Sequence, residues 1–263
     1  MKIGIIGEGA IGRYVRDGLL EKGHEIGAIL VRPERLRERS TESGGLNYVS
    51  AVDELPADID YMLDCAGHEA LRTLGPGILR RGIDLITVSI GALADADVQQ
   101  DLENAAAEGG AKLYLASGAI GALDCLQAAN VGTLKSVTYV GRKPPRGWKG
   151  SPAEEKLDLD GLSPGEHVHF DGTARDAATQ YPKNANVAAA VALAGVGFDD
   201  TRVLLLADPD LNENIHELRA EGDFGRFSFE IRGNALPDNP KSSALAAMSV
   251  VSTLERETAG VSF

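Results

Sequence analysis

A glycine-rich turn near the start of the chain constrains its fold more than any other feature. The motif G-x-G-x-x-G occupies residues 7–12 and directly follows a short apolar run at residues 2–6. Such a motif, leaving a strand and opening a helix, is the signature of a dinucleotide-binding domain. Its glycines permit the tight turn, the approach of the backbone to a pyrophosphate, and close packing of helix on strand. The residues expected to contact the dinucleotide here are Gly7, Gly9, Ala10, Ile11 and Gly12.

The first half of the chain alternates short β-branched runs with stretches of helical periodicity. The predicted strands span residues 2–6, 25–30, 60–64, 84–87 and 112–115. The predicted helices span residues 11–22, 69–81 and 94–108. This alternation is typical of an α/β Rossmann domain with a doubly wound parallel sheet, which we place at residues 1–117.

The second half has longer, partly alternating apolar runs, which predict a mixed or antiparallel sheet. Its predicted strands span residues 134–142, 167–172, 202–207, 214–221 and 225–233. Alanine-rich helices are predicted at residues 121–132 and 184–194. We therefore expect a second α/β domain at residues 118–241. The segment 242–263 is expected to form a C-terminal helix that packs back on the Rossmann domain.

Charge and cysteine usage exclude several classes of partner. The 39 acidic and 26 basic residues give a formal charge of −13, which repels nucleic acid and anionic membrane surfaces alike. An anionic substrate therefore needs a local cluster of cations. The two cysteines, Cys65 and Cys125, show no pairing or metal-binding spacing, and the start of the chain lacks a signal-peptide pattern. A cytoplasmic protein is expected.

Two loops that follow later strands of the first domain should also contact the cofactor. NAD-specific domains carry an acidic residue at the end of the second strand, whereas this chain has Arg32 there. Arg32 is suited to a 2′-phosphate, so the pattern leaves NAD, NADP or both open, and a solvated loop charge is the alternative reading. Cys65, Ala66 and Gly67 follow a later strand and are expected near the nicotinamide.

Four short motifs identify a family resemblance over nearly the whole chain. They are Ser-Gly-Ala-Ile-Gly at 117–121, Arg-Lys-Pro-Pro at 142–145, Tyr-Pro-Lys-Asn-Ala-Asn-Val-Ala at 181–188 and Asn-Ile-His-Glu at 214–217. In this order, behind the dinucleotide motif, they resemble the L-aspartate dehydrogenase family. The resemblance implies that the second domain, residues 118–241, is catalytic and builds the oligomer contact. It also implies that Ala119 and Asn186 contact NAD and that His216 is the catalytic residue.

The resemblance also implies a reaction. Members of the family oxidatively and reversibly deaminate L-aspartate with NAD or NADP, and the iminoaspartate formed either feeds pyridine nucleotide biosynthesis or hydrolyses to oxaloacetate and ammonia. A histidine of unperturbed pKa about 6.5 can exchange the protons that this chemistry needs. Asn214 and Glu217 flank His216, and we expect them to fix its tautomer or the local loop shape.

The two carboxylates of such a substrate require cationic or N–H-rich partners. Lys143, in the basic loop 142–149, is the preferred candidate, with Lys183 next; an exposed basic loop is the alternative. Asn184 opens an alanine-rich helix, where it can cap the helix and also bind substrate. Arg175 and Lys241 are weaker candidates.

Other readings remain open at this point. His167 and His169 share a face of a predicted strand, but no third ligand completes a metal site, so no metal is expected. The scaffold also suits a reductase of the dihydrodipicolinate-reductase or homoserine-dehydrogenase type, or a non-catalytic NAD(P)-binding protein. The open sheet expected in the second half can pair across a symmetry axis, which favours a homodimer.

Overall fold

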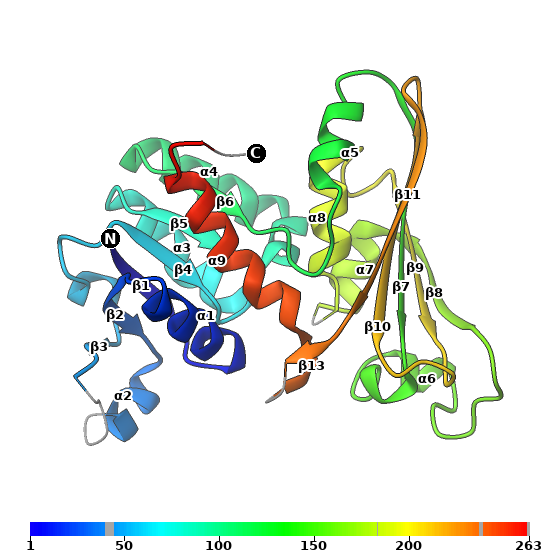
Figure 1. The fold of residues 1–263 in the computed structure, drawn as a ribbon, viewed down its shortest axis with the longest axis horizontal. Helices are drawn as coiled ribbons and strands as arrows, with labels where there is room; N and C mark the ends of the chain where they lie inside the picture. The colour runs from blue at the N-terminus through cyan, green and yellow to red at the C-terminus, as the bar shows by residue number, and fades with distance from the viewer. Residues whose placement is uncertain (40–44, 183, 237–238, 262–263) are drawn as a thin grey trace. The chain divides into compact units, whose positions relative to one another are not determined.

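A computed structural model describes residues 1–39, 45–182, 184–236 and 239–261 (Figure 1). The chain forms two compact units, of which the first comprises Met1–Ala116 together with Ala246–Phe263 and the second comprises Ser117–Leu245. None of the helices within the described ranges is long and apolar enough to cross a lipid bilayer.

The first unit is built on a six-stranded parallel sheet of order β3-β2-β1-β4-β5-β6. This is the Rossmann strand order, so the predicted fold class is confirmed. The strands read as near-continuous apolar runs because helices cover both faces of the sheet. They are β1 (Lys2–Ile6), β2 (Glu25–Leu30), β3 (Tyr48–Val49), β4 (Tyr61–Asp64), β5 (Asp84–Thr87) and β6 (Leu113–Leu115).

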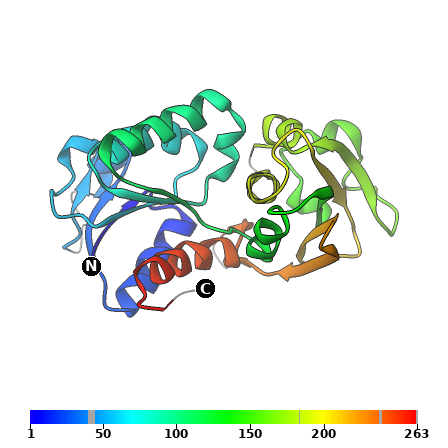
Figure 2. The same cartoon turned by 90° about the horizontal axis from the view of Figure 1, so that it is seen from above.

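Helices α1 and α9 cover one face of this sheet, and α3 and α4 cover the other (Figure 2). The helices of the unit are α1 (Ala10–Glu21), α2 (Pro33–Arg39), α3 (His68–Arg80), α4 (Ala96–Gly109) and α9 (Ala244–Thr258). Glu255 of α9 bonds His24 at 2.7 Å and Lys22 at 3.2 Å, next to the end of α1. The sequence analysis missed β3 and α2, because two and seven residues are too short to show a periodicity.

The second unit contains a five-stranded mixed sheet, as predicted. The order of its strands is β11-β10-β7-β9-β8. Strands β7 and β9 run parallel, and the other neighbours are antiparallel. Its strands are β7 (Leu134–Lys143), β8 (His167–Thr173), β9 (Thr201–Ala207), β10 (Asn214–Gly222) and β11 (Gly225–Gly233). A separate ribbon, β12 (Ala235–Leu236) and β13 (Asn239–Ser243), precedes α9; it was not predicted, and it delays the start of the C-terminal helix from the expected residue 242 to Ala244.

Helices α5, α7 and α8 lie on one side of this mixed sheet (Figure 1). The helices of the unit are α5 (Leu123–Ala129), α6 (Ala153–Lys156), α7 (Ala174–Gln180) and α8 (Asn186–Ala194). Helix α5 starts later than predicted because Ala122 adopts a left-handed conformation, with φ of 58°. The side chains of alternate residues, such as Tyr139, Gly141 and Lys143 of β7, share one face of the sheet.

Candidate active site

The turn between β1 and α1 has the shape that a pyrophosphate requires. Gly7 has a φ of +87°, which L side chains rarely adopt, and a Cβ on Gly12 would lie 2.2 Å from the carbonyl oxygen of Gly7. A Cβ on Gly9 would meet no atom within 4 Å, so its backbone faces open space. Ala10 and Ile11 begin the helix, whose free N–H groups attract phosphate. These residues fit a dinucleotide.

The loop after β4 lies directly beside this turn. A Cβ on Gly7 would lie 2.8 Å from Cβ of Ala66, and one on Gly12 would lie 3.7 Å from Cβ of Cys65. Gly67 precedes α3 with a φ of +106°. The structure therefore brings three sequence-predicted positions to the glycine motif. Arg32, at the end of β2, is exposed near the same edge, since Gly7 N donates to Leu30 O at 2.9 Å.

A buried carboxylate that the sequence analysis did not select holds this loop. Asp64 is fully buried, accepts from Ala66 N at 2.9 Å and accepts from Thr87 Oγ1 at 2.7 Å. Burial raises the pKa of Asp64, although these hydrogen bonds act in the opposite direction. The Asp-Cys-Ala-Gly order was the available signal, because a polar residue ending a buried strand needs a partner.

In the second unit, His216 lies on β10 and faces the side of the sheet that carries Tyr139. Its Nδ1 is 2.7 Å from Tyr139 Oη, and the residue is 5% exposed. Gly141 lies opposite His216 in the register, and a Cβ there would come within 2.8 Å of Tyr139 Oη. The absence of a side chain at Gly141 thus leaves room for the phenol to reach the imidazole.

Asn214 and Glu217 were expected to fix the tautomer of His216 or the local loop shape, and for Glu217 the tautomer role was wrong. Successive residues of a strand point to opposite faces, so Glu217 faces away from the imidazole. Its carboxylate pairs with Arg219 at 2.7 Å and accepts from Ser228 Oγ at 2.8 Å. Tyr139, distant in sequence, is the partner of the ring instead.

Lys143, at the end of β7, is a buried ammonium group. It is 8% exposed, its Nζ donates to Asn184 Oδ1 at 2.8 Å, and it lies 5.0 Å above the centre of the Trp148 ring. Within the described ranges no ion pair joins Lys143 to a carboxylate. Burial lowers the pKa of Lys143 to about 8. The alternative of an exposed basic loop therefore does not hold for Lys143, which faces the interior of the unit.

The prediction that Asn184 caps α8 was wrong. Ala185 occupies the N-cap, and the side chain of Asn184 accepts from Lys143 instead. Asn186 is the first residue of α8, and Ala119 is buried in the loop before α5. Lys183 lies outside the described residues, as does the side chain of the weaker candidate Lys241.

The other weaker candidate does not face this cluster. Arg175 forms a bidentate pair with Asp199, at 2.6 and 2.8 Å, on an exposed part of α7. Exposed pairs of this kind hold the side chain at the surface and contribute little to stability. Arg175 is therefore removed from the set of substrate-binding candidates.

Three aromatic residues around Lys143 were missed by the sequence analysis. His169 Nδ1 lies 3.1 Å from Tyr181 Oη, and the ring of His169 packs edge-on to Trp148 at 4.4 Å. A bulge in β8 places His169 in the interior, while His167 bonds the carbonyl of Ser163 at 2.8 Å. The two histidines therefore do not act as a pair. The single tryptophan, Trp148 within the basic loop 142–149, was the signal available.

The electrostatics of this cluster favour a neutral histidine beside a cation. Burial and the charge of Lys143 lower the pKa of His216 to about 3. Burial, Lys156 and Lys143 lower the pKa of His169 to about 4. Below pH 8 the cluster thus carries two neutral imidazoles and an ammonium group that no carboxylate of the described residues pairs with. The ammonium group of such a site attracts an anion, and a neutral imidazole beside it can accept a proton from the bound molecule.

A cavity of the second unit lies next to this cluster of Lys143, His216 and His169. It has a volume of about 280 Å³, adjoins the loop after Lys143 and is lined by Pro144, Arg146, Gly147, Asn212, Glu213, Asn214, Gly233, Asn234, Ala235 and Asn239. Neither His216 nor Lys143 lines it. Among the described residues, no group of three His, Cys, Asp or Glu side chains is positioned to bind a metal.

Two family models match the chain in succession. The NAD-binding domain of homoserine dehydrogenase matches residues 4–116. The C-terminal domain of aspartate dehydrogenase matches residues 124–257, which include both Lys143 and His216. The second match separates this chain from homoserine dehydrogenase, with which it shares the first domain.

Relatives of known name match over the full length. The L-aspartate dehydrogenase of Ruegeria pomeroyi is 51% identical over 99% of this chain and 94% of its own. The L-aspartate dehydrogenase of Pseudomonas aeruginosa is 43% identical over 100% of this chain and 99% of its own. The crystal structure of aspartate dehydrogenase from Thermotoga maritima superposes with a TM-score of 0.77 at 28% identity, covering 100% of this chain and 99% of that one. The chain therefore belongs to the L-aspartate dehydrogenase family of NAD(P)-dependent oxidoreductases.

Proposed function

We propose that this protein catalyses the reversible NAD(P)-dependent oxidative deamination of L-aspartate. The product, iminoaspartate, hydrolyses to oxaloacetate and ammonia or supplies pyridine nucleotide biosynthesis. The observation that carries the proposal is Lys143, a buried ammonium group without a carboxylate partner among the described residues. Its charge and burial together keep the nearby His216 neutral. Full-length relatives named L-aspartate dehydrogenase support the choice of substrate.

The first unit supplies the binding site for the coenzyme. Gly7, Gly9 and Gly12 shape the phosphate turn, and Cys65 to Gly67 form the adjoining loop. Ala119 and Asn186 are proposed to contact the same coenzyme. Bound NAD or NADP supplies a nicotinamide ring that accepts the hydride from Cα of the substrate, or returns it in the reverse direction.

His216 is proposed to move the proton of the substrate amine. The amine must be neutral when the hydride leaves, so a base has to take its proton. Nε2 of His216 can do this only in the tautomer whose Nδ1–H donates to Tyr139 Oη, which makes Tyr139 a positioning residue. Two substrate carboxylates near Lys143 offset its positive charge, which raises the pKa of His216 once substrate is bound.

Lys143 and Asn184 are proposed to hold a substrate carboxylate, with Lys183 as a further contact. An ammonium group already desolvated and held by one amide oxygen loses little freedom when an anion binds. The remaining donor positions of Nζ are suited to carboxylate oxygens, and the pair gains strength in this buried setting.

The test is a panel of coenzymes and substrates followed by absorbance. We expect aspartate-dependent reduction of NAD or NADP, and oxidation of the reduced coenzyme by oxaloacetate plus ammonia. Homoserine and the substrate of dihydrodipicolinate reductase belong in the panel, because the scaffold is shared. Tight binding of coenzyme without turnover of either aspartate or oxaloacetate would indicate a non-catalytic binding protein.

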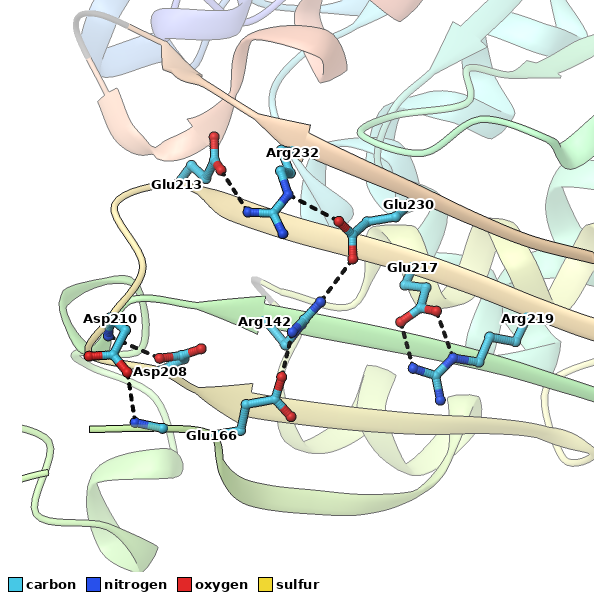
Figure 3. Close-up of polar contacts among 10 residues, drawn as sticks. Arg142, Glu166, Asp208, Asp210, Glu213, Glu217, Arg219, Glu230 and Arg232 are labelled. Atoms are coloured by element: carbon cyan, nitrogen blue, oxygen red, sulfur yellow. Dashed lines mark hydrogen bonds and ion pairs between the residues drawn. The ribbon is translucent and has the colours of Figure 1, made fainter. Parts of the chain in front are cut away.

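We propose a homodimer formed by the face of the mixed sheet opposite His216. Figure 3 shows that this face carries a network of ion pairs. In it Arg142 contacts Glu166 and Glu230, and Arg232 contacts Glu213 and Glu230. The side chains of Arg219 and Arg232 remain more than half exposed. A face carrying both signs in alternation can be complementary to itself across a two-fold axis. A cytoplasmic location, expected from the sequence, accords with this assignment and stays a prediction.

Light scattering on the purified protein tests the dimer. We expect twice the chain mass for the natural protein, and Arg232→Glu should shift the population towards the monomer, because like charges then meet across the axis. Arg80→Glu is the matched control, since Arg80 also bridges two carboxylates but lies in the first unit. A monomeric natural protein, or equal effects of the two variants, would contradict this interface.

A further inference from the structure

Trp148, the single tryptophan of the chain, presents the face of its ring to the ammonium group of Lys143. Nζ of Lys143 lies 5.0 Å from the centre of the ring, within the range in which an aromatic face attracts a cation. The indole is fully buried, so water weakens this attraction little. Among the described residues, the hydrogen-bond partner of the ammonium group is Asn184, at 2.8 Å. A ring and an amide, rather than a carboxylate, therefore stabilise the charge of Lys143.

Three contacts fix the indole ring beside the end of β7. Its Nε1 donates to the carbonyl oxygen of Leu206 at 2.9 Å, on β9, which is the parallel neighbour of β7. The rings of His169 and Tyr181 pack edge-on against it, with centroids at 4.4 and 6.2 Å. Because a neighbouring strand and two buried aromatic residues hold the ring, it cannot turn away from Lys143 without breaking these contacts.

An aromatic face and a carboxylate stabilise a buried cation in different ways. A carboxylate partner would cancel the positive charge and occupy the N–H donors. A ring attracts the cation through its quadrupole, so the net charge remains and the N–H donors are left for a ligand. We propose that Trp148 is the positioning residue of Lys143: its ring holds the ammonium group charged and in a fixed orientation, so that a substrate carboxylate binds there. The proposal rests on the proposed function, in which Lys143 binds that carboxylate.

The imidazoles and phenols that face Lys143 keep their charge state over the pH range in which this lysine titrates. Burial lowers the pKa of Lys143 to about 8. The pKa of His216 is lowered to about 3 and that of His169 to about 4, so both are neutral above pH 7. Lys156, which acts on His169, is exposed, so solvent screens its charge. Burial raises the pKa of both phenols of the cluster, Tyr139 and Tyr181. A change in anion binding around pH 8 therefore reports the charge of Lys143.

Two substitutions separate the aromatic face of Trp148 from its bulk. Trp148→Phe and Trp148→Leu both lose the bond to Leu206, but only the first keeps a ring. We expect KM for aspartate to be roughly tenfold higher in Trp148→Leu than in Trp148→Phe, the effect of losing a desolvated cation–π contact, with similar kcat in the two variants. Phe198→Leu is the matched control, because Phe198 is also buried beneath a cation of this unit, Arg175 at 5.4 Å. It should leave KM unchanged.

The pH profile of succinate binding is a measurement that a merely structural role would not change. Succinate is a dicarboxylate without an amine, and its Kd is measured by calorimetric titration of the protein with NAD bound. In the natural protein and in Trp148→Phe the Kd should increase as the pH rises through about 8. Removing the ring disfavours the charged form, so in Trp148→Leu the increase should begin at a pH about one unit lower. Equal profiles of the two variants, or equal KM values, would overturn the role of the ring.

The emission of Trp148 tests the contact in the natural protein, without any change to the ring. Because the chain has a single tryptophan, its emission reports this ring alone. Titration with succinate should change that emission with the same Kd that calorimetry gives, and a constant emission would contradict the contact. If Lys143→Met binds succinate as tightly as the natural protein, the proposed carboxylate site fails instead, so the two failures are distinguishable.

Discussion

Replacing His216 with alanine is expected to lower kcat for aspartate oxidation by about 10²–10⁴-fold, the usual contribution of a positioned acid–base group. The imidazole is buried, and burial together with Lys143 lowers its pKa to about 3, so it is a neutral proton acceptor throughout the working range. The Kd of the coenzyme should change little, because the phosphate turn lies in the other unit. Steady-state turnover and a coenzyme titration measure the two quantities.

Two further variants separate a catalytic from a merely structural effect of His216. Tyr139→Phe keeps the ring that packs in the core but removes the hydroxyl that orients His216, so kcat should fall while KM for aspartate stays close to its natural value. His167→Ala is the control, since His167 bonds the carbonyl of Ser163 outside the cluster. An unchanged kcat in His216→Ala, with the protein folded, would remove the proposed role.

Replacing Lys143 with methionine is expected to raise KM for aspartate roughly 10–100-fold, the usual effect of losing a hydrogen bond to a charged group. The fold should tolerate the change, because methionine matches the length of the stem and spares the cost of burying an ammonium group. Lys149→Met is the matched control: Lys149 lies in the same basic loop but is exposed and pairs with Asp160 at 2.6 Å. Equal effects of the two substitutions would show that general basicity, not Lys143, holds the substrate.

The pH dependence of anion binding tests Lys143 separately from catalysis. Burial lowers its pKa to about 8, so the ammonium form is present below pH 8 and is lost as the pH rises through that value. Succinate is a dicarboxylate without an amine and stays fully ionised above pH 7. Its Kd, measured by titration of the protein with coenzyme bound, should therefore increase between pH 7 and pH 9.5. A flat profile over this range would exclude Lys143 as the group that binds the carboxylate.

Local sequence patterns predicted the scaffold well. The strands Lys2–Ile6, Glu25–Leu30 and Asp84–Thr87 have the bounds that their apolar runs indicate, because a parallel strand buried on both faces is apolar over nearly its whole length after a polar first residue. The glycine motif likewise predicted the turn whose close contacts now explain Gly7 and Gly12. Very short elements such as β3 were not predicted, since two residues are too few to show a periodicity.

The sequence selected candidate residues for the site but not the contacts between them. Lys143, Asn184 and His216 were selected from motifs, and the structure joins the first two by a hydrogen bond and couples the first to the third by charge. The tautomer role assigned to Glu217 was wrong, because adjacent residues point to opposite faces of a strand. Tyr139, 77 residues away, could not be identified from any local pattern.

The sequence by itself determined the dinucleotide domain, the mixed sheet and the residue types that carry the chemistry, since these follow from periodicities and spacings along the chain. The tertiary structure alone decided which side chains meet: Tyr139 with His216, Lys143 with Asn184 and Trp148, and Glu8 with Tyr48. Pairings of this kind depend on strand register and on burial. Both are set by packing between segments far apart in sequence, and packing also sets the pKa values on which the proposed chemistry depends.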